Sequence, residues 1–120
     1  MFSHIMVGGN DLDRSKKFYD AVLGTLGAGP AMVDGHRIFY ITPTGIFSVS
    51  QPIDGEPATH GNGTMIALVV DSKDKVDALY LKAIELGGSD EGPPGPRGEG
   101  FYAAYFRDLD GNKLNFFCVG

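Results

Sequence analysis

The stretch His4-Ile5-Met6-Val7, with the turn and the apolar segment that follow it as far as Leu26, decides the fold because the chain repeats it. The run Met65-Ile66-Ala67-Leu68-Val69-Val70 restarts the pattern about halfway along, and a second apolar segment follows from Val76 to Leu86. The shift along the sequence that places Met65 on His4 also aligns other residues of the two copies. It places Leu79-Tyr80 on Phe18-Tyr19, Ile84 on Leu23, and Gly88 on Gly27. A repeat of this length is too long for a solenoid unit, so it predicts two copies of one module packed into a single domain.

Apolar periodicity and turn residues predict the elements of each copy. In the first copy we expect a strand over 2–7, a helix over 12–26 capped by Asp11, and strands over 31–33, 37–42 and 45–50. In the second copy we expect a strand over 63–70, a helix capped by Asp71 or Ser72, and strands over 101–107 and 113–119. The Gly- and Pro-rich segment 92–100 is expected to be a loop, either a lid over a ligand or a solvated connection.

The composition favours one globular domain in a reducing compartment. The chain has 120 residues, 42% hydrophobic and 21% charged, and this is enough to bury a core without disulfide bonds. Its single cysteine, Cys118, has no intrachain partner. The net charge of −5 with scattered cations argues against nucleic acid, and no basic leader or apolar run of roughly 18 residues points to a membrane. We therefore expect a cytoplasmic protein with neither nucleic acid nor membrane as a partner.

Two segments carry a resemblance to a known family. His4 in the first strand is followed by Asp11-Leu12, Ser15 and Phe18-Tyr19 ahead of Leu23-Gly24, and the run Phe106 to Leu114 closes the chain. In these segments the chain resembles the glyoxalase/bleomycin-resistance/dioxygenase superfamily, the vicinal oxygen chelate proteins. The resemblance implies an α+β fold of two βαβββ modules, each a curled sheet with one helix, around a cup-shaped ligand cavity. It places module one at about 1–52, a linker at about 53–62 and module two at about 63–120, in a chain that forms a homodimer.

The resemblance also implies a divalent metal held by the first and fourth strands of both modules. Carried onto this sequence, the four ligand positions fall on His4, Ser48, Met65 and Asn115. Serine and asparagine are weak neutral donors and a thioether is soft, so only His4 retains a usual ligand for zinc, iron or harder cations. We therefore expect neither a metal nor another cofactor.

Without the ion, the glyoxalase and dioxygenase reactions lose the group that stabilises their intermediates. What remains is a cavity with a few polar groups, typical of a binding pocket. We therefore predict a protein that binds a small molecule through His4, Ser48, Met65 and Asn115, with no catalytic residue assigned. The metal-free, antibiotic-sequestering branch of the superfamily that the chain resembles binds its ligands in this way. Each residue also has a structural alternative. His4 could be an interior histidine, Met65 could fill space in the core, and the Asn115 amide could be hydrogen-bonded to an ordered water.

Two other functions stay open. If the fourth strand is shifted by three residues, Gln51 replaces Ser48, and Glu56 or His60 could reach the site. The protein would then be a glyoxalase-like lyase or isomerase, or a dioxygenase, with a nonstandard metal shell. Alternatively, the fold serves only for association, as a non-catalytic subunit. A half-barrel module of this size leaves an apolar sheet face and edge uncovered, so the sequence itself also favours a homodimer.

Overall fold

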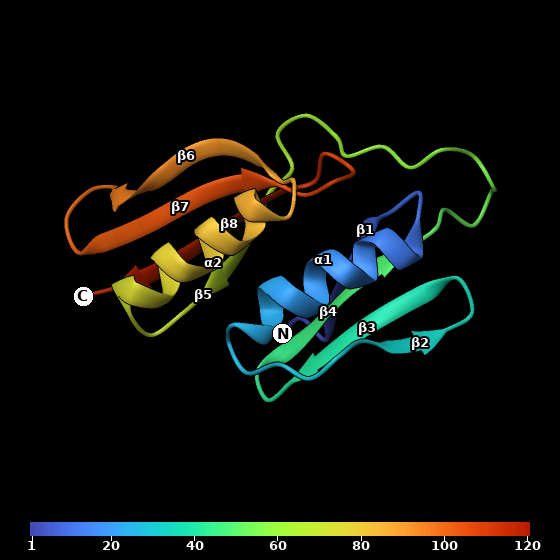
Figure 1. Cartoon of the computed structure of the whole chain (residues 1–120), viewed down its shortest axis with the longest axis horizontal. Coiled ribbons are helices and arrows are strands. Elements are labelled where there is room, and N and C mark those ends of the chain that lie inside the picture. Colours follow the sequence, from blue (N-terminus) through green and yellow to red (C-terminus); the bar gives the residue numbers. More distant parts are fainter.

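The repeat in the sequence is a repeat in the fold. The structure, a computed structural model, describes residues 1–120. The chain forms β1 (His4–Gly8), α1 (Leu12–Gly24), β2 (Met32–Asp34), β3 (Arg37–Thr42), β4 (Gly45–Ser50), β5 (Ile66–Val69), α2 (Lys73–Glu85), β6 (Ser89–Pro96), β7 (Phe101–Arg107) and β8 (Lys113–Val119). This order, strand, helix and three strands taken twice, confirms the predicted pair of βαβββ modules (Figure 1).

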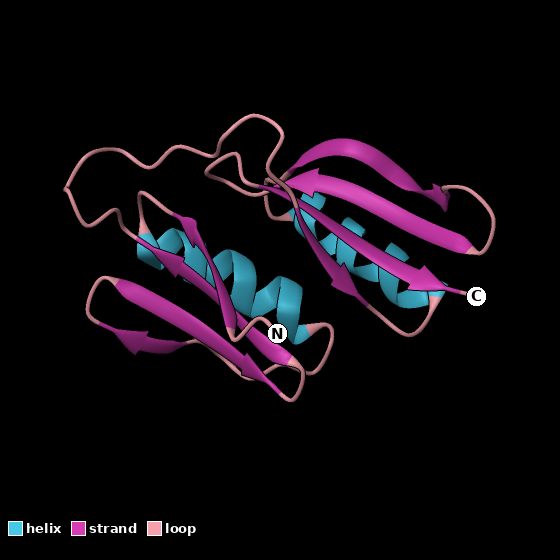
Figure 2. Cartoon of the chain, turned by 180° about the vertical axis from the view of Figure 1, so that it is seen from behind, coloured by secondary structure: helices cyan, strands magenta, loops and turns pink.

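Each module builds one four-stranded sheet with the same topology. The first sheet has the order β1-β4-β3-β2 and the second has the order β5-β8-β7-β6. In both, the first strand runs parallel to the last strand of its module, and the remaining neighbours are antiparallel. Seen from behind, both sheets lie in front of the helices, so each sheet keeps one face free of any helix (Figure 2). The two sheets do not join into a closed barrel.

The helices begin where polar side chains cap them. Asp11 Oδ1 accepts a hydrogen bond from the Arg14 backbone N–H at 3.1 Å, and this satisfies one of the free amides at the start of α1. Ser72 Oγ accepts from the Lys75 N–H at 3.2 Å at the start of α2. Ser72 is therefore the cap, whereas Asp71 pairs with the Lys75 ammonium at 2.8 Å.

A single apolar core joins the two modules. It contains 17 buried residues drawn from both helices and both sheets. Phe18 of α1 lies 6.4 Å, ring centre to ring centre, from Phe106 of β7, and the two helices contact each other. The two modules therefore share one apolar interior.

A polar cluster with two buried carboxylates links the start of α1 to the turn between β7 and β8. We call Asn10, Arg14, Tyr19, Asp108, Asp110 and Asn112 the inter-module cluster. Asp108 accepts from the Tyr19 hydroxyl at 2.6 Å and from the Asn112 amide at 2.9 Å, and that amide also donates to the Gly8 carbonyl at 2.8 Å. Asp110 accepts from Arg14 at 2.8 Å and from the Asn10 N–H at 3.0 Å. Both carboxylates are buried and well supplied with donors, so the turn is fixed to the other module.

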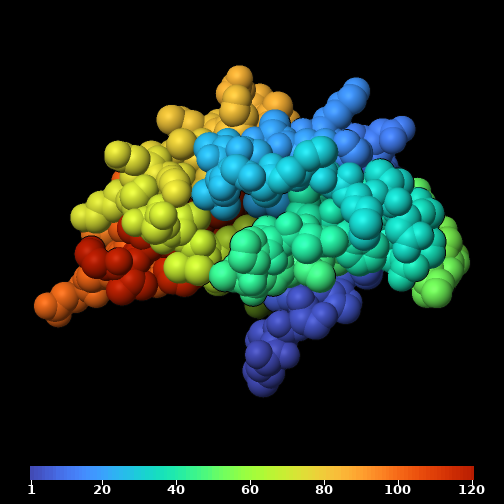
Figure 3. All heavy atoms as spheres, turned by 90° about the horizontal axis from the view of Figure 1, so that it is seen from below, coloured from blue at the N-terminus to red at the C-terminus, as the bar shows by residue number.

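One predicted element is wrong. The segment 92–100, expected to be a loop, contributes as far as Pro96 to β6, which pairs with β7 through irregular register shifts. Other boundaries differ by a few residues; for example, β5 begins at Ile66 although the apolar run starts earlier. Residues 1–3 precede β1 and project from the body of the protein (Figure 3). Neither α1 nor α2 has the length and apolar character needed to cross a bilayer.

Candidate functional site

Ser48 and Asn115 occupy equivalent positions on the helix-free faces of the two sheets. Ser48 of β4 pairs with Met6 of β1, and Asn115 of β8 pairs with Ala67 of β5. Ser48 is 0% exposed and its hydroxyl donates to the Ile5 carbonyl at 2.8 Å. Asn115 is 2% exposed and its amide donates to the Ala104 carbonyl at 3.4 Å, a long hydrogen bond. Both side chains are thus tied to the main chain of a neighbouring strand.

His4 and Met65 lie nearer to solvent. His4 opens β1, is exposed, and places its Nδ1 2.9 Å from the Ser3 hydroxyl. Met65 precedes β5 and is 43% exposed. Of the four predicted site residues, only His4 lines the larger cavity described next. The structure therefore does not gather the four in that cavity, and their role in binding stays a prediction.

A groove of about 750 Å³ runs between the two modules. It lies between the open end of the first module and β5 with the start of α2. The strands β1 and β5, which each have only one neighbour in their sheets, both contribute to it. More than half of its lining residues are apolar, and they include Leu23, Leu26, Ile41, Phe47, Ile66 and Leu68. A groove of this size and character suits an organic molecule of moderate size.

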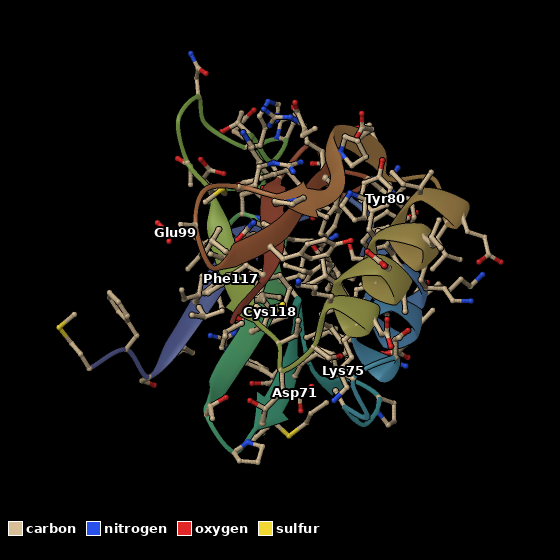
Figure 4. The ribbon with its side chains drawn as sticks, turned by 90° about the vertical axis from the view of Figure 1, so that its left-hand side faces the viewer. Asp71, Lys75, Tyr80, Glu99, Phe117 and Cys118 are labelled. Carbon is tan, nitrogen blue, oxygen red and sulfur yellow. The ribbon has the colours of Figure 1, made fainter.

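Few polar groups face this groove. They include His4, the Asp71–Lys75 ion pair and Tyr40. Figure 4 shows Asp71 and Lys75 close together at the start of α2. The Tyr40 hydroxyl donates to Asp20 Oδ1 at 2.7 Å, and burial, with that carboxylate, raises the pKa of Tyr40 far above its usual value. Tyr40 therefore remains a neutral hydroxyl. Sequence reasoning missed Tyr40 and Lys75 because neither belongs to a motif and both reach the groove only through the packing of the modules.

The residues at the family's metal positions do not fit a divalent ion. The Ser48 hydroxyl donates its only proton to a main-chain carbonyl. The other three side chains could offer a metal one imidazole, one thioether and one amide, and the amide is hydrogen-bonded to the main chain as well. No carboxylate stands among the four, so the charge of a divalent ion would be left uncompensated there. Nowhere in residues 1–120 do three or more His, Cys, Asp or Glu side chains gather in a way that could hold a metal.

The residues considered as alternative metal ligands lie in two other places. Gln51 and Glu56 line a separate hollow of about 550 Å³, together with His36. Gly9 and Asn10, which follow β1, also line this hollow, whereas His4 lies at the beginning of that strand. His60 packs against Gly111, where a Cβ atom would come within 2.6 Å of its Nδ1. In β4, Ser48 is the residue opposite Met6, and Gln51 follows the last residue of that strand.

The fold and this strand arrangement define a member of a known superfamily. The family model of the Glyoxalase/Bleomycin resistance protein/Dioxygenase superfamily matches residues 1–116, and the chain belongs to this superfamily. A search of curated proteins found no match.

Solved structures agree with this assignment. The chain is 50% identical to a glyoxalase/bleomycin resistance protein from Albidiferax ferrireducens T118, with a TM-score of 0.96 over 100% of this chain and 99% of that one. It is 22% identical to the fosfomycin resistance protein FosX from Mesorhizobium loti, with a TM-score of 0.75 over 100% of this chain and 92% of that one. A putative glyoxalase from Bacillus halodurans is also 22% identical, with a TM-score of 0.79 over 98% of this chain and 95% of that one. The last two share the fold.

Proposed function

We propose that this protein binds a small organic molecule without a divalent metal. The observation that carries the proposal is the hydrogen bonding of Ser48 and Asn115, the residues at two of the positions where the resemblance places metal ligands. Both donate to main-chain carbonyls of adjacent strands, at Ile5 and Ala104, and neither supplies negative charge. Such positions favour a pocket in which apolar area supplies affinity and a few polar groups fix orientation.

The proposal includes a homodimer in the cytoplasm. Large apolar side chains stand exposed on the helix-free faces: Met6, Met32 and Ile41 on the first sheet, and Val69 and Val119 on the second. Covering such a surface is favourable at about 25 cal/mol per Å² of apolar area. A second copy of the chain is the occupant that we propose, because it would cover both faces at once and enclose a ligand.

The metal question is tested on the purified protein by elemental analysis and by thermal melts. We expect less than stoichiometric zinc, nickel or iron, and an unchanged melting temperature when a chelator is added, because a metal stabilises only if it binds the native state. About one ion per chain, lost on chelation with a fall in melting temperature, would overturn the proposal. The variant His4→Ala is the matched control, since it removes the only usual ligand and should change neither result.

The homodimer is tested by sedimentation. We expect a mass near twice the 12.8 kDa of one chain at micromolar concentration. Ile41→Lys places a charge on the helix-free face and should shift the protein toward the monomer. Val33→Lys is its control, because Val33 is similarly exposed but points to the opposite face of the sheet. A wild-type monomer, or equal effects of the two substitutions, would contradict the proposed interface.

A lyase with a nonstandard metal shell is the second candidate. The hollow that holds Gln51, Glu56 and His36 is the observation in its favour, since it offers one amide, one carboxylate and one imidazole. If an ion is found, its loss in Glu56→Gln would support this candidate. An ion that survives this substitution would exclude the hollow as the metal site.

A further inference from the structure

The helix-free face of the second sheet carries two cations on one aromatic ring. Tyr105 of β7 lies opposite Asn115, on the face away from the core residues Ala104 and Phe106. The Arg97 guanidinium carbon lies 5.6 Å from the centre of the Tyr105 ring, and the Lys113 ammonium lies 5.6 Å from the same centre. The two cations are therefore no farther apart than twice that distance. Each is favourably placed against the electron-rich ring.

Neither cation has an acidic partner. Six ion pairs occur in the chain, and Arg97 and Lys113 take part in none of them. Of the acidic residues on the neighbouring segments, Glu91 pairs with Arg107, and Glu99 is exposed and pairs with neither cation. In a chain whose net charge is −5, two unpaired cations on one ring are a local feature that the overall charge does not explain.

The Gly- and Pro-rich strand β6 is shaped around the Arg97 guanidinium. Arg97 Nη1 donates to the Pro96 carbonyl at 3.2 Å and Nη2 donates to the Pro93 carbonyl at 2.5 Å. A Cβ atom at Gly95 would come within 3.0 Å of Nη1, and one at Gly92 would come within 3.3 Å of Nη2. Glycine at these two positions leaves the space that the guanidinium fills. The side chain is thus held in place by neutral carbonyls while its charge stays uncompensated.

The same face turns apolar along β8. The rings of Phe101 and Phe117 stack at 4.8 Å, and Val119 lies opposite Phe101. Figure 4 shows Phe117 on the side of the sheet away from α2. Phe117 follows Lys113 by four residues, which is roughly 13 Å along an extended strand. Asn115 stands between them and is almost fully buried. The face therefore passes from cationic to amide to aromatic.

We propose that the ligand is an amphipathic organic anion. Its flat apolar body packs on Phe101 and Phe117, and its carboxylate, sulfonate or phosphonate group is received by Arg97 and Lys113. An acidic group fits there because both cations are unpaired and a guanidinium and an ammonium are strong donors to anionic oxygens. This inference rests on the proposed function, whose ligand class it specifies, and it assigns Arg97, Tyr105 and Lys113 to the site in addition to Asn115.

Two fluorescent probes with the same aromatic skeleton test the inference. Anilinonaphthalene sulfonate carries an anionic group, and phenylnaphthylamine is its neutral counterpart. We expect the wild-type protein to bind the sulfonate about tenfold more tightly than the neutral probe. Lys113→Met and Arg97→Met should each remove most of this preference while leaving the affinity for the neutral probe unchanged. Phe117→Ala should weaken both probes.

Control variants separate local charge from net charge and from unfolding. Lys17→Met makes the same change in net charge on the exposed side of α1, and it should leave both affinities unchanged. Gly95→Ala should lower the affinity for the sulfonate less than Arg97→Met does, because it only displaces the end of the guanidinium, 3.0 Å from the added Cβ atom, and keeps its charge. All variants are compared only where their thermal melts stay cooperative, since an unfolded chain also binds the sulfonate. Lys113→Met and Arg97→Met each remove one of the two cations on the Tyr105 ring, so either suffices if the other fails to fold.

The outcomes are distinct. Equal affinity for the two probes, or a preference that survives Lys113→Met and Arg97→Met, overturns the anionic ligand and leaves a neutral-ligand pocket. Failure of the wild-type protein to bind either probe overturns the proposed binding function together with this inference. Equal effects of Lys17→Met and Lys113→Met show that net charge alone attracts the anion, and this also overturns the inference.

Discussion

At the scale of residues, the two modules carry side chains of different size at equivalent positions of their sheets. Ser48 and Asn115 stand at equivalent points of the parallel strand pairs, yet the hydroxyl is fully committed at 2.8 Å whereas the amide holds its carbonyl at 3.4 Å. The neighbours differ in the same sense, because Met6 faces Ser48 and Ala67 faces Asn115. The larger amide therefore stands beside the smaller neighbour, and its weak hydrogen bond leaves it the freer of the two to bind a ligand.

Replacing Asn115 by Leu tests that freedom. Leucine keeps the branched shape and the number of side-chain heavy atoms, and only a long hydrogen bond is lost, so we expect the free energy of unfolding to change by less than about 1 kcal/mol. Binding of the small molecule should be lost, because a polar contact on the face is removed. Thermal melts with and without anilinonaphthalene sulfonate measure both effects. A loss of about 1–3 kcal/mol in the ligand-free protein would instead identify Asn115 as structural.

Tyr19 is expected to matter to stability rather than to binding. Its hydroxyl donates to the buried Asp108 carboxylate at 2.6 Å, and Tyr19→Phe leaves that carboxylate short of a donor. We expect a loss of roughly 1.5–3 kcal/mol, as for hydrogen bonds to charged groups. Tyr80→Phe is the control, because its bond to Asp90 lies at the surface and should contribute less. Urea unfolding of both variants decides the matter, and equal losses would contradict this role of Asp108.

The buried tyrosines also predict an alkaline limit of stability. Burial, and next the Asp108 charge, raises the pKa of Tyr19 well above 10.0, and burial likewise raises the pKa of Tyr40. Below the unfolded pKa both states keep the phenolic protons. Above it the unfolded chain binds fewer protons than the native protein, so stability falls as pH rises. Urea midpoints from about pH 8 to about pH 11 should show this fall, and it should be shallower in the double variant Tyr19→Phe, Tyr40→Phe. A fall of equal slope in both proteins would contradict the assignment.

At the scale of elements, the sequence predicts best the strands whose apolar residues form the core. The strands over 37–42, 45–50, 101–107 and 113–119 have the predicted bounds, because each combines apolar alternation with a turn signal. Prolines and glycines are poor strand formers, so the sequence predicts a loop over 92–100, where the structure continues β6 as far as Pro96. It is an edge strand with only β7 as a neighbour, and an edge tolerates prolines and register shifts that a central strand cannot.

Two glycines near helix ends should respond in opposite ways. At Gly88 a Cβ atom would lie 2.8 Å from the Ala83 carbonyl oxygen and 2.9 Å from that of Arg107, and neither main-chain atom can move freely. Gly88→Ala should therefore cost about 1–3 kcal/mol or more. At Gly24, in α1, a Cβ atom meets nothing within 4 Å, so Gly24→Ala should be neutral or stabilise by up to about 1 kcal/mol. Denaturant midpoints measure the pair, and a neutral Gly88→Ala would contradict the close approach.

At the scale of the whole molecule, the fold could be predicted from the sequence and the site only in part. The internal repeat and the closing motif predict the fold, because both reflect the order of strands and helices along the chain. The face that carries Asn115 with Lys113 and Phe117 follows from strand alternation. Arg97 and Tyr105 could not be found this way, because their contact depends on how β6 bends over β7. The groove likewise arises only when the modules pack together.

The shared core and the inter-module cluster make the covalent link between the modules dispensable. The turn at Asp54-Gly55-Glu56 is exposed, whereas the packing of α1 against α2, the contact of Phe18 with Phe106 and two buried carboxylates hold the halves together. A single proteolytic cut in this turn should yield two fragments that elute together in native conditions and separate only in denaturant. The nicked protein should melt in one transition, lower than the intact chain because separate fragments gain more entropy on unfolding. Two transitions, or dissociation at neutral pH, would show that the modules are independent. The chain is thus two halves that complement each other, as separately supplied fragments would.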